Sequence, residues 1–378
     1  MRRSPGLVGV NVCRLEDRCV PAIFVVNSNA DTDDANKGDG FALDNTGHTT
    51  LRAAVQEANA LAGQSEETRQ HQIQFNTAMT VSLNSSMEPF TADIGVIYTP
   101  VIAVTDGDPP PLPAPVVIQG DGTFRLFKIE SGSSSSFDGR FQITGGNAVF
   151  DYGGAFRVEG SLGLTGCEIY GNSARYGGGI SVDTGSTLSV SGCSIHSNHS
   201  QMDGAGLINY GTTYITSATE IFDNTADGLG GGIFSGSGGD TAVSGNSDIF
   251  ENTAGENGGG VYNMSMATFT MSGGSIFLNE ATGKTQEGNF LFGLGGGVYN
   301  AGAGGIVTLT GVTIERNTAG GWGGAMYLAV NSSTSLNNCT IQQNTAAMGA
   351  KGIAFEMGAA PVGAGNTWGA ADQEPVEV

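Results

Sequence analysis

The sequence predicts an all-β protein: a right-handed parallel β-helix, a three-strand solenoid of about ten turns, with a short helix capping its N-terminal end. Two observations predict this fold. From about residue 140 the chain repeats a pattern with a period in the twenties, and 62 of its 378 residues are glycine, about twice the average share of roughly 7%. Repeats of that length cannot bury their own apolar faces, so neighbouring repeats must stack.

Each repeat has an Ile, two variable residues, an Asn, a turn, a glycine run and an aliphatic residue. Examples are IYGNSARYGGGI, IFDNTADGLGGGI and IFENTAGENGGGV. An Asn that returns once per turn can hydrogen-bond to its stacked neighbour and to the turn backbone, so we expect a structural ladder along one corner. Its expected members are Asn172, Asn198, Asn224, Asn252, Asn279, Asn317 and Asn344.

Within one repeat, three strand-like runs stand between turn residues: GVYN, ATFTMS and SIFLN. Gly, Asn, Ser and Thr bound each run, as expected of short strands joined by tight turns. Each strand would pair with its counterpart in the next turn, and parallel crossovers prefer right-handed coiling. The glycine runs are expected at a corner that requires positive φ angles or close approach of stacked backbones.

The N-terminal region divides into two parts. Residues 1–22 are expected to be an export-type segment, although they lack the apolar stretch of a conventional signal peptide. Residues 23–72 form the expected cap, in which TTLRAAVQEANALA (49–62) places its apolar residues on one helical face. Such a helix would cover the open edge of the first turn, which otherwise invites aggregation.

The β-helix is expected over residues 73–370. Residues 84–115, which end in a proline-rich run, are expected to be an inserted loop because proline cannot donate to a strand ladder. A second insertion, residues 283–294, is placed to fold over a row of aromatic residues described below. The last residues, 371–378, are expected to be a frayed acidic tail.

Three segments resemble known surface proteins. The IxxN…GGGI arrangement is similar to the GGA(I/L/V) and FxxN repeats of chlamydial polymorphic outer membrane proteins, within the pectate-lyase-like right-handed β-helix superfamily. Residues 24–61, which contain TTLRAAVQEAN, resemble the CSLREA domain of bacterial surface helices without its two usual cysteines. LEDRCVPA (15–22) resembles the N-terminal export motif of planctomycete surface proteins. These resemblances imply a secreted or cell-surface protein.

Composition and cysteine usage exclude several classes of protein. The formal net charge is −21 at pH 7, from 15 Lys and Arg against 36 Asp and Glu, which excludes a nucleic-acid binder that works by neutralising phosphates. No apolar run of about 18 residues occurs, so no membrane-spanning helix is expected. Cys167 and Cys193 occupy a position that Thr or Ser fills in other repeats, so we expect stacked, buried neighbours rather than a redox or metal pair.

The residues that carry catalysis in the pectate-lyase-like superfamily do not occur together here. Pectate lyases use an acidic calcium cluster with an Arg base, and polygalacturonases use paired Asp residues near a His and an Arg-x-Lys. This chain has no Arg-x-Lys, and no acid pair accompanies His196 and His199. Arg140, Arg157 and Arg175 are interpreted as isolated surface cations.

We therefore expect a non-enzymatic secreted or cell-surface protein, adhesin-like or part of the cell envelope. The alternative is a protein that binds polysaccharide, or degrades it as a lyase or hydrolase. The partner expected in either case is a polysaccharide or another cell-surface molecule, and calcium is the one cofactor that the residues suggest.

An acidic and aromatic patch recurs at the same offset from Ile221 and Ile249. Parallel strands about 4.8 Å apart would stack its carboxylates along one face, where like charges raise one another's pKa or recruit a cation. A weak calcium site, a carbohydrate-hydrolysing acid pair and a plain solvated face remain open interpretations. The patch consists of Glu220, Asp223, Asp248 and Glu251, with Phe222 and Phe250 between them.

A second row follows the glycine runs, at the position expected to point outward. An exposed aromatic row can stack sugar rings or bind a partner, which makes Phe234, Tyr262 and Tyr299 the candidate ligand-binding residues. The alternative is a row covered by neighbouring loops or stacked for stability. The full row is expected to be Phe156, Ser181, Ile208, Phe234, Tyr262, Tyr299 and Met326.

A third candidate is the acidic segment 31–44 of the cap. It is an alternative calcium site, although its spacing does not match an EF-hand loop, which needs a Glu at its twelfth position. An ordinary solvated loop is the competing interpretation. The candidate ligands are Asp31, Asp33, Asp34 and Asp39.

Overall fold

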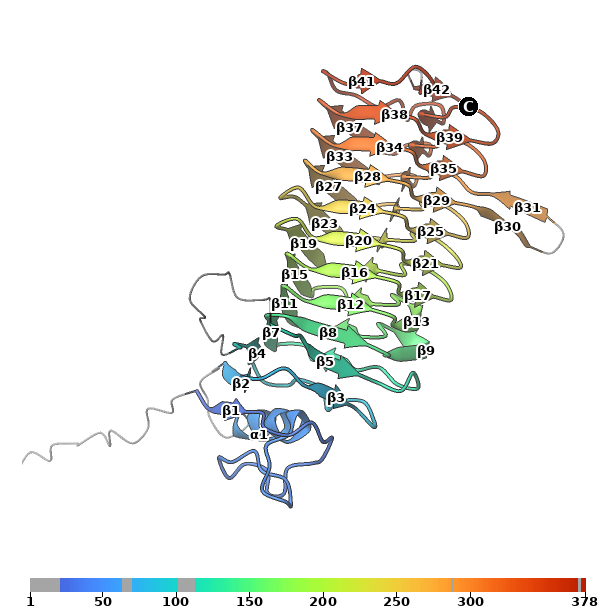
Figure 1. Cartoon of the computed structure of the whole chain (residues 1–378). Coiled ribbons are helices and arrows are strands. Elements are labelled where there is room, and N and C mark those ends of the chain that lie inside the picture. The colour runs from blue at the N-terminus through green and yellow to red at the C-terminus, as the bar shows by residue number, and fades with distance from the viewer. Residues whose placement is uncertain (1–20, 63–69, 101–112, 287–288, 373–374) are drawn as a thin grey trace, which may run out of the picture.

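The computed structural model describes residues 21–62, 70–100, 113–286, 289–372 and 375–378. The expected export-type segment therefore lies almost wholly outside the described residues. Four parallel sheets run along a solenoid of about ten turns, which rises from a helix at the N-terminal end to the last strands at the C-terminal end (Figure 1). The predicted parallel β-helix is confirmed, with one short strand per turn more than expected.

Sheets A and B each contain eleven strands. Sheet A consists of β1 (Ile23–Val25), β2 (His71–Phe75), β4 (Ile94–Tyr98), β7 (Ser134–Asp138), β11 (Ser161–Thr165), β15 (Thr187–Ser191), β19 (Thr212–Thr216), β23 (Asp240–Val243), β27 (Thr268–Ser272), β33 (Ile306–Thr310) and β37 (Ser333–Asn337). Sheet B consists of β3 (Thr80–Ser82), β5 (Val116–Gln119), β8 (Phe141–Thr144), β12 (Glu168–Tyr170), β16 (Ser194–His196), β20 (Glu220–Phe222), β24 (Asp248–Phe250), β28 (Ser275–Phe277), β34 (Thr313–Glu315), β38 (Thr340–Gln342) and β41 (Thr367–Trp368).

Sheets C and D complete each turn, and sheet D is the additional one, built mostly from two-residue strands just after the recurring Asn. Sheet C consists of β6 (Phe127–Ile129), β10 (Phe156–Val158), β14 (Ile180–Val182), β18 (Leu207–Asn209), β22 (Ile233–Ser235), β26 (Val261–Asn263), β32 (Val298–Asn300), β36 (Met326–Leu328), β40 (Ile353–Phe355) and β42 (Val376–Glu377). Sheet D consists of β9 (Asn147–Tyr152), β13 (Ser173–Tyr176), β17 (His199–Ser200), β21 (Thr225–Ala226), β25 (Thr253–Ala254), β29 (Glu280–Ala281), β35 (Thr318–Ala319) and β39 (Thr345–Ala346).

The N-terminal cap contains α1 (Leu51–Ala62), which lies under the first turn (Figure 1). The hydroxyl of Thr50 accepts a hydrogen bond from the Ala53 backbone N–H at 3.0 Å, which makes Thr50 the N-cap. Leu51 and Val55 are fully buried in the same core as the first solenoid strands. The helix therefore closes the N-terminal end of the core, as expected.

Three segments differ from the expected loops and tail. Within residues 84–115, β4 pairs in parallel with β2 and β7 and so belongs to the solenoid. The insertion at 283–294 forms an antiparallel hairpin, β30 (Gly283–Gln286) and β31 (Asn289–Phe292), which projects away from the solenoid (Figure 1). The acidic tail contributes β42, which pairs with β40.

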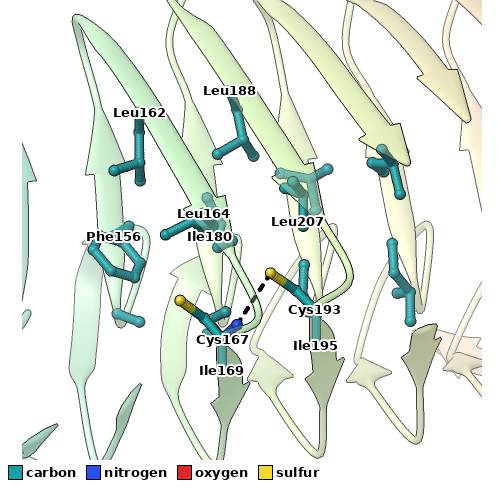
Figure 2. Close-up of a cluster of buried hydrophobic side chains, with 14 of the residues drawn as sticks. Phe156, Leu162, Leu164, Cys167, Ile169, Ile180, Leu188, Cys193, Ile195 and Leu207 are labelled. Atoms are coloured by element: carbon teal, nitrogen blue, oxygen red, sulfur yellow. Dashed lines mark hydrogen bonds between the residues drawn. The ribbon is translucent and has the colours of Figure 1, made fainter. Parts of the chain in front are cut away.

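The interior is filled by alternate residues of each strand, and the same positions stack from turn to turn. Ile169, Ile195 and Ile221 pair in register in sheet B and are fully buried. Cys167 and Cys193 stack beside them, where the Cys167 backbone N–H lies 3.3 Å from Cys193 Sγ (Figure 2). Both thiols are free and 2% exposed, so the prediction of stacked, buried neighbours is confirmed.

The glycine runs lie at the corner between sheets D and C. Gly230 has a φ of 65°, in the left-handed region that favours glycine. A Cβ atom on Gly231 would lie 2.4 Å from the carbonyl oxygen of Gly259 in the next turn. Each run thus supplies both the positive φ and the close backbone approach that the sequence predicted.

Candidate functional site

The Asn ladder lies at the corner between sheets B and D, and each of its seven members is at most 1% exposed. Asn252 shows the pattern: its Nδ2 donates to the carbonyls of Ile221 and Phe250 and to Asn279 Oδ1, at 2.9 to 3.0 Å. Its Oδ1 accepts from the backbone N–H and the side-chain amide of Asn224. The ladder therefore satisfies backbone groups that the turn would leave buried and unpaired.

The ladder ends on a residue that sequence reasoning missed. Asp372 is fully buried, and its Oδ1 accepts from the backbone N–H and from Nδ2 of Asn344, both at 2.9 Å. It stands 28 residues after Asn344, so the period of the repeat was the available signal.

The predicted acidic and aromatic patch lies on the outer side of sheet B. Strands β20 and β24 pair Glu220 with Asp248, and the rings of Phe222 and Phe250 stack with centroids 4.8 Å apart. The ring stack is longer than the sequence indicated. It runs through Tyr170, His196, Phe222, Phe250 and Phe277 with centroid spacings of 4.6 to 5.3 Å, and the guanidinium of Arg316 lies 5.7 Å from the last ring.

Two of the four carboxylates of this patch accept hydrogen bonds from the protein. Asp223 Oδ2 accepts from the Ser197 hydroxyl at 2.8 Å, and Asp248 Oδ1 accepts from the Ser275 backbone N–H at 2.7 Å. Among the residues that the structure describes, no group of three or more His, Cys, Asp or Glu side chains could hold a metal ion. The calcium site therefore stays a prediction, with no supporting geometry.

The predicted outward row on sheet C needs a correction at both ends. Phe156 pairs with Ile180, and Met326 pairs with Val298, so both belong to the inward column and are fully buried. In both turns Ala replaces the third glycine of the run, which displaced the sequence alignment by one residue. The outward row is Lys128, Arg157, Ser181, Ile208, Phe234, Tyr262, Tyr299 and Tyr327.

The aromatic part of this row is stacked and covered. Successive rings from Phe234 to Tyr327 are nearly parallel, with centroids 5.0 to 5.4 Å apart, so their faces contact one another. Phe234 is 3% exposed, and burial raises the pKa of Tyr299 to about 12. The Tyr327 hydroxyl donates to Glu356 Oε1 at 2.9 Å. Rings used in this way offer no free face to a sugar, which favours the stacked, covered interpretation.

The acidic segment 31–44 is tied to the cap helix. Arg52 donates to both carboxylate oxygens of Asp31, at 2.7 and 2.9 Å, and Gln56 Nε2 donates to Asp33 Oδ1 at 2.8 Å. Asp34 is buried and its backbone N–H donates to Gln56, whereas Asp39 is exposed and accepts from Asn36. Helix residues thus bind the carboxylates of two of the four candidate calcium ligands, Asp31 and Asp33.

A buried carboxyl of the helix completes this contact. Glu57 accepts from the backbone N–H groups of Gly38 and Gly40, and burial raises its pKa, helped by neighbouring Asp34. Hydrogen bonds from His48 and Thr46 hold the pKa of Asp44 well below its usual range. Glu57 thus binds the segment to α1, whereas Asp44 stabilises the turn that follows the segment.

Arg157 is not an isolated cation. Its guanidinium lies 3.2 Å from Asp151, 3.1 Å from Glu159 and 2.9 Å from Asp183. Arg125 also binds Asp151, at 2.6 Å, and Lys128 pairs with Glu130 and Glu159. The 26-residue spacing of Arg157 and Asp183, one repeat, was the signal that could have identified the pair.

The other two arginines also have contacts: Arg140 donates to the Pro113 carbonyl, and Arg175 lies over the Tyr176 ring.

This ion-pair network borders an open cleft on the outer side of sheet C, with a volume of about 420 Å³. Its floor and walls are Tyr152, Arg157, Asp183, Thr184 and Tyr210. Polar groups and aromatic rings converge there, which is the usual composition of a small-molecule site. The cleft is open to solvent, and Thr184 in its wall is exposed.

Comparison with known proteins assigns this chain to no family. The chain matches no family model and no curated protein sequence. Among the described residues, no helix is long and apolar enough to cross a membrane.

Proposed function

We propose that this chain is a non-enzymatic secreted or cell-surface protein, in which the β-helix is a rigid, adhesin-like or cell-envelope scaffold. The observation that supports this most directly is the uninterrupted Asn ladder, which runs from Asn172 to Asp372 through buried hydrogen bonds. About ten turns at roughly 4.8 Å each make a rod about 50 Å long. A rod of this kind suits a protein that holds a surface at a fixed distance from the cell.

Two features of the chain agree with an extracellular role. Strands that are paired on both sides and fully buried resist local opening, and therefore proteolysis, better than mobile segments do. The net charge of −21 keeps the rod soluble and separate from other copies. The resemblance of residues 15–22 to an export motif supports this proposal.

Localisation is tested with an antibody against the purified protein in the cells of the organism that encodes it. We expect the antibody to label intact cells or to detect the protein in the medium, and added protease to remove the cell-bound signal. Labelling that requires permeabilised cells, with the protein only in the cytosolic fraction, would overturn the proposal.

The absence of catalysis is tested separately. Purified protein is incubated with a panel of neutral and acidic polysaccharides, and new reducing ends and unsaturated uronate products are measured. We expect no product above that of a heat-unfolded sample. Turnover that co-purifies with the folded protein and disappears on unfolding would show instead a polysaccharide lyase or hydrolase.

A further inference from the structure

Exposed apolar side chains gather at the corner between sheets C and A in the last four turns. Two earlier turns have the charged residues Glu159 and Asp183 at the same corner, directly after β10 and β14. An exposed apolar group on a soluble protein is typical of a surface that contacts another molecule. This apolar corner consists of Met264, Met266, Ile306, Val330 and Met357, each of which is at least 38% exposed.

The surface around this corner carries almost no charge, although the chain has 36 acidic residues. Residues 264–272, 301–310 and 329–337 run from the corner through sheet A and contain no charged residue. The fourth turn, residues 356–363, has only Glu356, whose two oxygens accept hydrogen bonds from the protein at 2.9 and 2.7 Å. The outer side of these four segments is called the neutral face below.

The corner is held rigid by a second, shorter set of buried asparagines. Asn263 Nδ2 donates to Asn300 Oδ1 at 2.9 Å and to the Ile306 carbonyl at 3.1 Å, and both asparagines are fully buried. Met266 lies against the next turn, since a Cβ atom on Gly304 would lie 3.4 Å from its Cγ. A partner therefore meets a surface whose backbone is already fixed, which lowers the entropic cost of binding.

The charge of the chain indicates which partner fits the neutral face. Each copy has a net charge of −21, so two copies repel each other wherever their acidic faces meet. On the neutral face that repulsion is weakest, and contact there would remove apolar groups of both copies from water. A strongly charged partner would find no opposite charge on this face. The neutral face therefore fits a second copy of the chain better than a charged partner.

The size of the neutral face fits a weak dimer. Four turns of roughly 4.8 Å each extend about 19 Å along the rod. A five-residue strand of sheet A and the corner beside it extend roughly 25 Å across the rod. The resulting area, about 500 Å² per copy and roughly 1,000 Å² in total, is at the lower limit for a specific interface. A contact of this size is expected to dissociate readily.

We propose that the neutral face binds the neutral face of a second copy, so that two rods form a weak, symmetric dimer through their last four turns. The contact is isologous, with the same side chains on both copies. The apolar corner supplies the contacts that exclude water. The inference concerns the purified protein in solution and does not depend on where the protein is found. The polar contacts come from outward residues of β27, β33 and β37 that pair in register, Thr270, Thr308 and Ser335.

The test is sedimentation velocity of the purified full chain, at protein concentrations from about 1 to 500 µM and at two concentrations of sodium chloride. The dimer fraction should rise with protein concentration, with a Kd of about 10–100 µM. Salt screens the repulsion between the acidic faces and leaves an uncharged contact intact. The Kd should therefore fall several-fold when sodium chloride is raised from about 50 to 500 mM.

Charged substitutions locate the contact on the neutral face. Met266→Glu and Ile306→Glu each add one charge per copy at an exposed position and should raise the Kd by about tenfold or more. Leu278→Glu is the matched control, because Leu278 is 39% exposed at the corner between sheets B and D, where the preceding turn already has Glu251. The control adds the same charge and should change the Kd by less than about twofold. Urea unfolding curves verify that each variant folds.

Three outcomes would overturn the inference. The first is a wild-type chain that stays monomeric up to about 500 µM. The second is a dimer that Met266→Glu and Ile306→Glu leave unchanged while both variants fold, since the contact would then lie elsewhere. The third is equal weakening by these substitutions and by Leu278→Glu, which would assign the effect to net charge alone. None of these outcomes changes the localisation result, so failure of the inference is distinguishable from failure of the proposed scaffold function.

Discussion

Two columns of side chains run the length of the solenoid, and they behave differently. At the corner between sheets B and D, the same residue returns in seven successive turns, each Asn buried and bonded to the next. On the outer side of sheet C, the residue changes from turn to turn, from Lys128 and Arg157 through Ser181 to a run of aromatic rings. One column is uniform and the other is varied.

The difference follows from what each column must satisfy. The Asn column faces buried backbone N–H and carbonyl groups, whose positions are the same in every turn, so only one side-chain shape fits. The side chains on the outer side of sheet C contact other side chains instead, as ion pairs at Arg157 and as stacked rings from Phe234 to Tyr327. The second column can therefore vary from turn to turn, as at the ion-pair network around Arg157.

The largest effect is expected at the uniform column. Asn252→Ala should lower the free energy of unfolding by about 3–5 kcal/mol, because it removes five buried hydrogen bonds of the side chain, at roughly 0.5–1.5 kcal/mol each, and takes away the partner of the Asn224 backbone N–H. Urea unfolding measures the loss. The exposed Asn76 is the matched control, and Asn76→Ala should change the value by less than about 0.5 kcal/mol. Equal effects of the two substitutions would contradict the ladder's structural role.

The aromatic run of the varied column should be sensitive to alkali. The folded pKa of Tyr299 is about 12, above its ordinary value of 10, because burial disfavours the phenolate. Its stabilising contribution is thus complete below pH 10 and is lost as the pH rises from 10 to 12, by about 2–3 kcal/mol. Tyr299→Phe keeps the ring and removes the titration, so the variant should lose that much less stability than wild type between pH 9 and pH 12. Parallel loss in both proteins would show that the hydroxyl is solvated.

The cleft of the varied column depends on the glycine beneath Tyr210. Gly236→Ala should destabilise the fold by about 1–3 kcal/mol, because the added methyl group overlaps the tyrosine ring. In a Tyr210→Ala background the same substitution should cost less than about 0.5 kcal/mol, since the three heavy atoms nearest to that Cβ all belong to the Tyr210 ring. A double-mutant cycle in urea measures the coupling. Additive effects would mean that Gly236 serves the backbone rather than the ring.

The smallest effect is expected at the acidic patch of sheet B. Because Asp223 and Asp248 already accept hydrogen bonds from the protein, calcium should raise the melting temperature no more than sodium chloride at equal ionic strength. A larger, calcium-specific rise would support the predicted site at Glu220, Asp223, Asp248 and Glu251. Asp223→Asn with Glu251→Gln should then abolish it, and a rise that survives both substitutions would move the site to residues 31–44.

Much of the fold could be predicted from the sequence because its signals are local and repeat. The Ile–x–x–Asn spacing correctly predicted both the ladder and the inward isoleucines, since in-register parallel pairing brings equal positions together. The prediction was wrong where a repeat departs from the common sequence pattern. Phe156 and Met326 were aligned one residue out of register because an Ala replaces the third glycine of the run in their turns. The strand β4 was assigned to a loop because its segment contains several prolines.

The sequence by itself therefore determined the β-helix, its capping helix, the buried Asn corner and the stacked cysteines. Only the tertiary structure decided which outer surfaces are covered and which are open. Phe234 is buried although its position points outward, and Arg157, which has no charged neighbour in its own strand, meets carboxylates from three different segments. The reason is physical: the core depends on a repeated local pattern, whereas the outer face depends on how loops of unequal length pack across neighbouring turns.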